Sequence, residues 1–372
     1  MNFSYWEIQS WLTRVDFTIV GSGIVGLTAA IAVKERLPKA NVLVLERGML
    51  PQGASTKNAG FACFGSLSEI LDDLNTHTED EALQLIEKRW KGLKALRERL
   101  GDDTIAFQQS GGYELFAQKD EALYANCLEQ LPKINELLFP LFQREVFTTK
   151  ENTFGFERVQ PKLIWNALEG QLDTGKMMSA SLQKAQAAGV KILNQVTVEA
   201  YTEGEDGVTV KTNHFELNTR KLLVATNGFA TQLGIAGTKP ARAQVLITKP
   251  IKNLHINGTF HLDKGYYYFR NIDDRILLGG GRNLDFKGEE TTEMAQTQLI
   301  QEQLESLLRD VILLDTPFEV DHRWSGIMGV GDQKKPIIKQ LSDHVFCGVR
   351  LGGMGVAIGS LVGEELAELT LE

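Results

Sequence analysis

A group of glycines near the start of the chain has the spacing of a phosphate-binding turn. Residues Gly21, Ser22, Gly23, Ile24, Val25 and Gly26 form the pattern G-x-G-x-x-G. In such a turn the first glycine allows a tight bend, the second lets a pyrophosphate approach the backbone, and the third lets helix and strand pack closely. Glu46 follows Gly26 by 20 residues, where an acidic side chain can accept hydrogen bonds from an adenosine ribose. These residues predict a dinucleotide site, and the acid disfavours the 2′-phosphate of NADP.

The segments around these residues have the pattern of the elements that must position them. Val15 to Val20 is a short apolar run typical of a strand buried on both faces, and Leu27 to Glu35 is expected to be a helix. The run NVLVLE then predicts a second buried strand that ends at Glu46. A membrane anchor is the disfavoured alternative. A spanning helix needs about 20 apolar residues, and glycine, serine and threonine interrupt this stretch.

A second loop of small residues follows the ribose acid almost at once. Residues 53–60 are GASTKNAG, where an NAD-binding domain would continue with another helix and strand. Such a loop can run along a pyrophosphate and under a flat ring system, with Ser55 as a donor. At this point the sequence resembles the FAD-dependent D-amino-acid oxidase superfamily, in its glycine/sarcosine oxidase-like branch. The matching segments are the glycine motif, ERG at 46–48 and G-A-S-x-x-N-x-G at 53–60. The resemblance implies FAD as the cofactor.

Further matches to this family are spread along nearly the whole chain. ATNG at 225–228 resembles the second FAD motif, RWSGIMG at 323–329 the W-x-G stretch, and RLGGMG at 350–355 the terminal glycine loop. A glycine loop before a helix N-terminus can stabilise the negative charge of a reduced flavin. The residues expected to bind FAD are Gly21, Ser22, Gly23, Ile24, Val25, Gly26, Glu46, Arg47, Gly53, Ala54, Ser55, Thr56, Asn58, Ala59, Gly60, Val196, Ala225, Thr226, Gly228, Gly326, Gly352, Gly353, Met354 and Gly355.

The residues expected to contact a substrate are fewer. The resemblance implies that a hairpin strand carrying Tyr266, Tyr268 and Arg270 faces the ring, and strand alternation places these three on one face. His322 lies beside the W-x-G motif, and Arg350 enters the terminal glycine loop, so both are further candidates. Arg270 and Arg350 could hold an anionic group of the substrate. Core packing of the tyrosines, a structural role for His322 and surface ion pairs of the arginines remain open alternatives.

The chain departs from the family at positions that matter for the chemistry. Ile327, Met328 and Ala357 stand where relatives that bind an amino-acid carboxylate have basic residues. Leu277 stands where a lysine assists the reaction with oxygen in some relatives. We therefore expect slow reoxidation by oxygen, with oxygen or a carrier as the electron acceptor. Cys63 lies close to the expected ring system, and a covalent link to the flavin is a less favoured alternative.

Composition and motif spacing limit the class and the domain arrangement. The net charge of −9 argues against nucleic-acid binding, and three scattered cysteines fit a reducing, cytoplasmic compartment without a metal site. The expected fold is α/β and two-lobed, with a Rossmann-like FAD-binding lobe of the glutathione-reductase type. This lobe would comprise residues 1–75, 155–235 and 322–372, and a β-sheet substrate lobe would comprise residues 76–154 and 236–321. The charges of the helix that ends at Gly101 are expected to form a solvated face.

The sequence thus predicts an FAD-dependent oxidoreductase. The resemblance implies hydride transfer to flavin N5 from the carbon beside the nitrogen of an amine or amino acid. An enzyme of the same fold that oxidises a 2-hydroxy acid or a polyol phosphate is the first alternative. A flavin-binding protein without turnover is the second.

Overall fold

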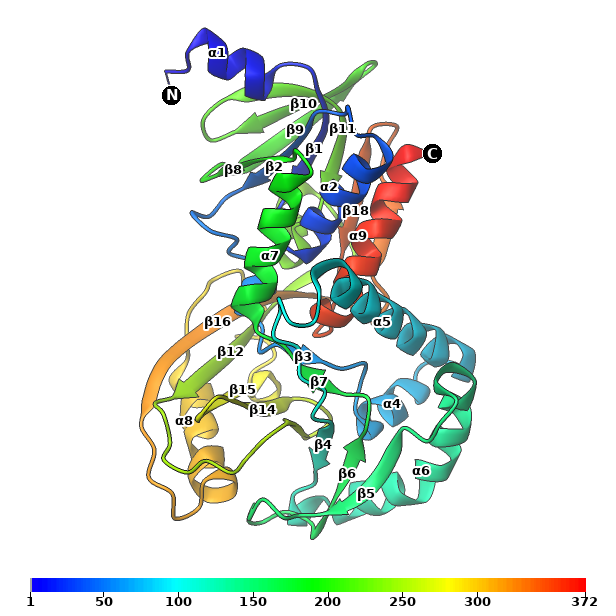
Figure 1. Cartoon of the computed structure of the whole chain (residues 1–372), viewed down its shortest axis with the longest axis vertical. Helices are drawn as coiled ribbons and strands as arrows, with labels where there is room; N and C mark the ends of the chain where they lie inside the picture. Colours follow the sequence, from blue (N-terminus) through cyan, green and yellow to red (C-terminus); the bar gives the residue numbers. More distant parts are fainter. Residues whose placement is uncertain (1) are drawn as a thin grey trace.

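The computed structural model describes residues 2–372, and two eight-stranded sheets form its framework. In Figure 1 the first sheet lies in the upper part of the molecule, together with both chain ends. The second sheet lies in the lower part. The two-part α/β architecture agrees with the expected fold class.

The first sheet is built around the predicted N-terminal strand, β1 (Val15–Val20). It runs parallel to β11 (Glu216–Val224) on one side and to β2 (Val42–Glu46) on the other. Five of its six residues are buried, as expected for a central parallel strand. The other strands of this sheet are β8 (Lys191–Asn194), β9 (Val198–Gly204), β10 (Gly207–Thr212), β17 (Ile337–Gln340) and β18 (Val345–Val349).

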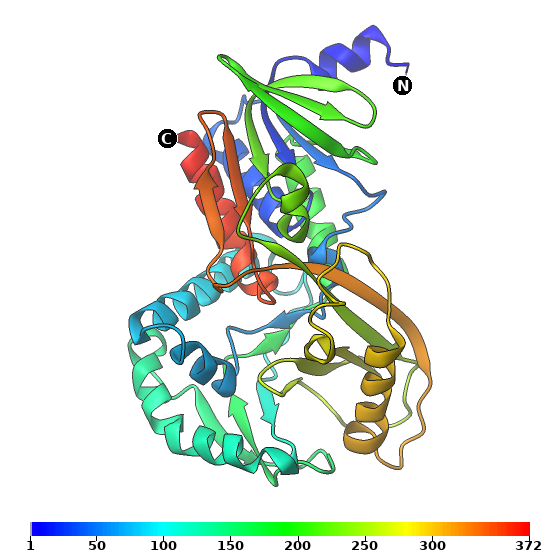
Figure 2. The ribbon, with the colours of Figure 1, turned by 180° about the vertical axis from the view of Figure 1, so that it is seen from behind.

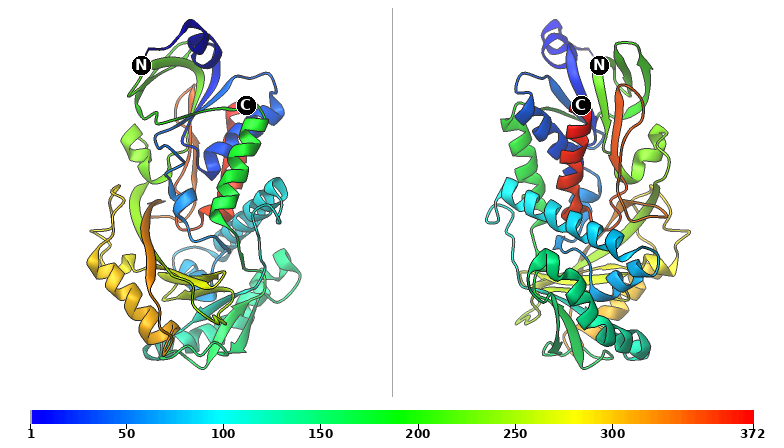
Figure 3. Two further views of the ribbon diagram at one scale, coloured as in Figure 1. Left: turned by 60° about the vertical axis from the view of Figure 1, so that its left-hand side comes forward. Right: turned by 90° about the vertical axis from the view of Figure 1, so that its right-hand side faces the viewer.

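Three helices cover one face of the first sheet. Helix α2 (Ile24–Arg36) packs between α7 (Thr174–Ala187) and α9 (Gly355–Leu371), as Figure 3 also shows. Every residue of α2 from Ile24 to Val33 is buried, because this helix is apolar on all sides. It begins three residues earlier than expected, directly after Gly23. A second core cluster joins residues of β1, β2, β11 and β18 to the strands β9 and β10 of the same sheet and to the short helix η3 (Asn227–Leu233).

The second sheet is largely antiparallel and follows the order β16-β12-β15-β14-β13-β4-β6-β5. The predicted hairpin forms, with β14 (Tyr267–Ile272) paired to β15 (Arg275–Gly280). Strands β13 and β4 form a parallel pair. The remaining strands are β4 (Gly112–Leu115), β5 (Phe147–Glu151), β6 (Lys162–Asn166), β12 (Lys239–Thr248), β13 (Thr259–Leu262) and β16 (Val320–Val330).

Helices flank the second sheet and connect it to the first part of the molecule. Helix α8 (Gln298–Leu307) packs on the core formed by β12 to β15. Helices α4 (Leu67–Leu74) and α6 (Glu121–Phe142) pack near β5 and β6. Helix α5 (Glu79–Leu100) ends at Gly101 as expected and packs along α9 of the first part (Figure 2). Helix α5 therefore joins the two parts.

Two strands that the expected domain boundaries assign to the FAD-binding lobe belong to the second sheet instead. Both β6 and β16 pair in the second sheet, whereas the expected boundaries place residues 155–235 and 322–372 with the first. Long-range strand pairing decides their sheet. The short elements are α1 (Tyr5–Glu7), η1 (Ile8–Leu12), α3 (Ala54–Lys57), β3 (Phe61–Ala62), η2 (Gln118–Asp120), β7 (Gly170–Gln171), η4 (Arg282–Leu284) and η5 (Leu308–Ile312).

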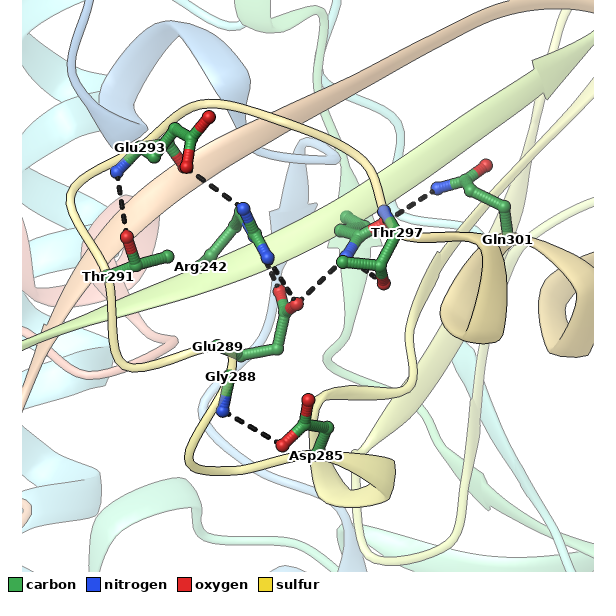
Figure 4. Close-up of polar contacts among 9 residues, drawn as sticks. Arg242, Asp285, Gly288, Glu289, Thr291, Glu293, Thr297 and Gln301 are labelled. Atoms are coloured by element: carbon green, nitrogen blue, oxygen red, sulfur yellow. Dashed lines mark hydrogen bonds and ion pairs between the residues drawn. The ribbon is translucent and has the colours of Figure 1, made fainter.

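A buried ion pair fastens the loop 281–297 to the second sheet (Figure 4). Arg242 on β12 donates through Nε and Nη2 to the two carboxylate oxygens of Glu289, at 2.9 and 2.7 Å. Gln244 donates to the same carboxylate at 3.0 Å and accepts from the backbone N–H of Thr297 at 2.9 Å. The Arg242 and Glu289 side chains are 6% and 1% exposed. Apart from Gly281 and Glu289, the residues of this loop are exposed or half-buried, so these contacts determine its position.

Glu289 and Glu290 provide a test of this anchor. Replacing Glu289 with alanine should destabilise the protein by about 3–5 kcal/mol, because Arg242 would remain buried without its partner. Glu290 contacts Lys239 only at 3.9 Å and both side chains are more than half exposed. The control Glu290→Ala should therefore change stability by less than about 0.5 kcal/mol. Thermal unfolding of both variants measures the difference, and equal effects would contradict the proposed anchor.

Candidate cofactor and substrate site

One continuous cavity of about 500 Å³ lies between the two sheets. Residues at the carboxyl ends of β1, β2 and β11 line one end of it, where ligands bind in open parallel sheets. Residues of β13 and β14, and the turn between them, line the other end. The cavity can therefore hold an extended molecule that reaches from the first sheet to the second.

The first glycine motif forms the turn between β1 and α2. Gly21 has a φ of +103°, a conformation that favours glycine. The backbone N–H of Ile24, at the start of α2, donates to Ser55 Oγ at 3.0 Å. A Cβ atom on Gly23 would lie only 2.8 Å from the same oxygen. The bare backbone of Gly23, the N-terminus of α2 and Ser55 thus form one polar surface suited to a pyrophosphate.

Glu46 ends β2 at the edge of this surface. Its Oε2 accepts from the backbone N–H and the hydroxyl of Ser22, at 3.1 and 2.7 Å. Its Oε1 accepts from the backbone N–H of Gly48 at 2.9 Å. These bonds fix the carboxylate at the cavity wall, and its contact with a ribose stays a prediction. The neighbouring Arg47 lies over the ring of Phe229.

The terminal glycine loop opens onto the same cavity. A Cβ on Gly352 would meet nothing within 4 Å, and one on Gly353 would meet only Met328 Sδ at 4.0 Å. Within residues 2–372, the N-cap residue Met354 makes no side-chain hydrogen bond to the N-terminus of α9, which follows. Its free N–H groups can therefore stabilise negative charge on a bound ring.

Most of the residues expected to bind FAD line the cavity. Four do not, and their contacts give the physical reason. A Cβ on Gly26 would lie 2.0 Å from the carbonyl oxygen of Gly21, so this glycine serves helix–strand packing as expected. Added Cβ atoms on Gly60 and Gly228 would also strike backbone carbonyls, while the Thr56 hydroxyl donates to the Pro51 carbonyl. The expected residues that line the cavity are Gly21, Ser22, Gly23, Ile24, Val25, Glu46, Arg47, Gly53, Ala54, Ser55, Asn58, Ala59, Val196, Ala225, Thr226, Gly326, Gly352, Gly353, Met354 and Gly355.

These features fit FAD. Two helix N-termini, neither capped by the side chain of its own N-cap residue, and open glycine backbones face one cavity, which suits a pyrophosphate and a ring that becomes negatively charged on reduction. The buried hydroxyl of Thr226 lines the cavity and has no hydrogen-bond partner within residues 2–372. A bound cofactor could satisfy it.

Aromatic rings line the cavity end next to the second sheet. Tyr266 and Tyr268 line it together with Phe61, which packs edge-on against Tyr268. Tyr267 instead packs into the core beneath α8, so Tyr267 and Tyr268 lie on opposite faces of the strand, as expected. Burial raises the pKa of Tyr268 to about 12, and its hydroxyl therefore keeps its proton.

Arg270 and His322 lie outside the cavity. Arg270 shares the face of Tyr268, but its guanidinium is buried behind Gly60, and burial lowers its pKa to about 10. His322 is exposed and stacks on Trp324. The sequence could not show this, because β16 carries His322 beyond the point where the strand passes the cavity.

Arg350 lines the cavity, but its side chain is already engaged. Its Nε donates to the Lys335 carbonyl at 2.9 Å and its Nη1 to the Gly237 carbonyl at 3.0 Å. The guanidinium thus holds two loops, which makes it a poor candidate for an anion clamp.

The structure adds a buried histidine that the sequence did not single out. His261 on β13 lines the cavity, and its Nε2 lies 2.5 Å from Glu169 Oε1. Glu169 also accepts from the Thr259 hydroxyl at 2.8 Å. Burial alone would lower the pKa of His261, but the carboxylates of Glu169, Glu69 and Glu114 raise it to about 9. His261 and Glu169 are 92 positions apart in the sequence, so a local motif could not predict their contact.

Cys63 lies beside this pair. Its sulfur, a His261 nitrogen and a Glu169 oxygen are within 4.8 Å of one another, and it lies 4.0 Å from Met354 Sδ. Burial and the nearby carboxylates raise the pKa of the Cys63 thiol well above its usual value. The thiol therefore stays protonated. The His261–Glu169 contact is within hydrogen-bond distance.

Comparison with known proteins identifies the family. The model of the DAO family, described as FAD dependent oxidoreductase, matches residues 16–369. The chain belongs to this family. It is therefore an FAD-dependent oxidoreductase, and the cofactor predicted from the glycine motifs is confirmed.

Relatives of this oxidoreductase match along nearly its whole length. The Haemophilus influenzae protein named "Probable oxidoreductase OrdL" is 22% identical over 377 residues, which cover 97% of this chain and 84% of that protein. The structure of glycine oxidase from Bacillus cereus superposes with a TM-score of 0.76 at 16% identity, covering 96% of this chain and 97% of that one. Iminodiacetate oxidase from Chelativorans sp. BNC1 gives 0.75 at 18% identity, with 95% of both chains covered. Within residues 2–372, no helix of the oxidoreductase is long and apolar enough to cross a membrane.

Gly23 tests the pyrophosphate surface of the oxidoreductase. Gly23→Val should abolish FAD binding, because the side chain would occupy the space in front of Ser55 Oγ. The measurement is the flavin content after acid extraction of the purified protein. Gly204→Val is a matched control, since Gly204 lies on strand β9 away from the cavity. Full flavin content in Gly23→Val would refute the assignment.

The His261–Glu169 pair predicts a pH dependence of stability. Because the pKa of His261 in the folded protein lies above its usual 6.5, the stability it contributes is complete below that pH and is lost as the pH rises toward about 9. Glu169→Gln should lower this pKa below 6.5, because burial then dominates. NMR titration of the histidine rings measures both values. An unchanged His261 pKa in the variant would contradict the coupling.

Proposed function

We propose that this oxidoreductase oxidises the carbon–nitrogen bond of an amine or amino acid. When bound, FAD would supply the chemistry by accepting a hydride from the carbon beside the nitrogen. Solved structures of the same fold carry the names glycine oxidase and iminodiacetate oxidase, which act on such compounds. The observation that carries the proposal is the single cavity, which joins the dinucleotide-binding glycines to an aromatic, charged wall.

The residues of that wall suit a small amine. Phe61, Tyr266 and Tyr268 supply ring surfaces that exclude water and favour a cationic nitrogen. Glu69 lines the cavity and has no lysine, arginine or histidine within 4.0 Å in the described part of the chain. Its carboxylate can therefore attract the ammonium group of an arriving substrate. Tyr268, which stays protonated, can donate a hydrogen bond to a substrate oxygen.

Leu277 bears on how fast oxygen would reoxidise the reduced flavin. Its buried side chain packs with Ala59 and Val245, next to Tyr268 and Trp324. An apolar residue at this place adds no positive charge that would favour reduced oxygen species. Slow reoxidation by oxygen therefore remains our expectation.

Reduction of the bound flavin tests the proposed reaction. Under anaerobic conditions, a panel of primary and secondary amines and amino acids should bleach the visible flavin absorbance. A matched panel of 2-hydroxy acids and polyol phosphates should not. Reduction by the hydroxy compounds alone would overturn the proposal. Admission of air to the reduced protein then measures reoxidation, which should be slower than with an artificial acceptor.

A further inference from the structure

Arg89 is a charged residue on the buried side of helix α5. The buried residues of this helix are Ala82, Leu85, Ile86, Arg89, Gly92, Leu93 and Leu96, at the spacing of one helical face. Arg89 is 5% exposed, and it is the one charged member of this stripe. We expected the charges of this helix to be solvated, so Arg89 departs from that expectation. An arginine on an apolar stripe needs a reason, because burying a charge is costly.

The contacts of Arg89 satisfy only part of its guanidinium. Nη1 donates to the carbonyl oxygen of Phe64 at 2.9 Å, and no other hydrogen bond joins its side chain to residues 2–372. The guanidinium of Arg89 forms no salt bridge with a carboxylate of those residues. A guanidinium carries five N–H donors, so several remain unused.

Arg89 lines the cavity close to the expected ring site. Phe64 and Gly65 border its guanidinium, and its charge lowers the pKa of the neighbouring Cys63 thiol against the larger effects of burial and carboxylates. Further along the same helix, Gly92 abuts the first turn of α9, where an added Cβ would lie 2.3 Å from the Ala357 carbonyl oxygen. Helix α5 thus carries Arg89 to the part of the cavity that the terminal glycine loop borders.

Of the other cations of the cavity wall, Lys57 is partly exposed and the rest are exposed or engaged. Among residues 2–372, Arg89 is the one lysine or arginine of this wall that is buried. Lys264 pairs with Asp72 at 3.0 Å, and Lys334 pairs with Asp73. Arg282 lies over the ring of Phe286 on the anchored loop 281–297. A substrate anion held by Arg89 would thus be held by a desolvated cation, where charge-assisted bonds are strongest.

We propose that Arg89 binds the anionic group, a carboxylate, of the amine substrate and selects for substrates that carry one. This inference rests on the proposed function and names the substrate class of the same site. The unused N–H groups of Arg89 would receive the carboxylate, and the amine would lie toward the aromatic wall and Glu69. The enzyme would then oxidise amino acids in preference to simple amines.

Ligand pairs of equal shape and different charge test this role without turnover. The probes are acetate against acetamide and benzoate against benzamide, titrated into the FAD-loaded protein and followed by the change in its visible flavin spectrum. The unaltered protein should prefer the carboxylates by about tenfold or more, since bonds to charged groups are about twice as strong as neutral ones. Arg89→Met should remove the preference and keep the affinity for the amides. Arg89→Lys should retain part of it.

Arg282→Met is the matched control, because it removes a cation from another part of the same wall. It should keep the preference for carboxylates. An Arg89→Met protein that still prefers carboxylates overturns the inference, and so does an unaltered protein that binds no carboxylate better than its amide. Should Arg89→Met fail to fold, Arg89→Gln provides the neutral variant.

Kinetics with the best amine substrate separate this inference from the proposed function. Arg89→Met should raise KM by about tenfold or more for an amino acid, since each tenfold corresponds to about 1.4 kcal/mol. The KM for the matching amine without a carboxylate should change little. If no amine reduces the flavin while the carboxylate preference persists in the titrations, the proposed function fails and the anion site at Arg89 stands.

Discussion

The close approach of helix α2 to strand β1 is the constraint on which the rest of the structure depends. A side chain on Gly26 would collide with the carbonyl of Gly21, and one on Gly23 would collide with Ser55. Because these side chains are absent, α2 starts directly at the carboxyl edge of the first sheet with its N-terminus open to the cavity. Ser55 then fixes the second loop against the same helix. The two loops together form the cofactor wall that the second sheet faces.

Two sets of buried charges in this protein differ in how far their hydrogen bonds are satisfied. Arg242 and Glu289 satisfy each other through two hydrogen bonds, and the pair holds a loop in place. At the cavity, His261 is paired with Glu169, but the guanidinium of Arg89 has one carbonyl partner among residues 2–372. An unpaired buried cation is tolerated where a ligand can complete it, and for this reason such groups mark functional sites. The Arg242–Glu289 pair therefore differs from Arg89 in that its charged groups have their hydrogen-bond partners within the protein.

Most residues that the sequence predicts to bind the cofactor line the cavity. Strand β1, the turn at Gly21 to Gly26, strand β2 and the terminal glycine loop all lie in short local segments, so their residue patterns can be recognised in the sequence. The substrate half was anticipated less well. Tyr266 and Tyr268 line the cavity as expected, because strand alternation is a local rule. Arg270 and His322 lie elsewhere, and Arg350 holds backbone carbonyls.

The sequence by itself determined the family, the cofactor and the local elements that bind it, since these follow from motifs a few residues long. Only the tertiary structure decided which charged residues share the cavity. His261 on β13 contacts Glu169, which lies between β6 and β7, and Arg89 reaches the cavity because α5 packs along α9. Both contacts join segments far apart in the chain, where spacing in the sequence carries no information about distance. The physical reason is that packing of whole elements, and not local propensity, sets these distances.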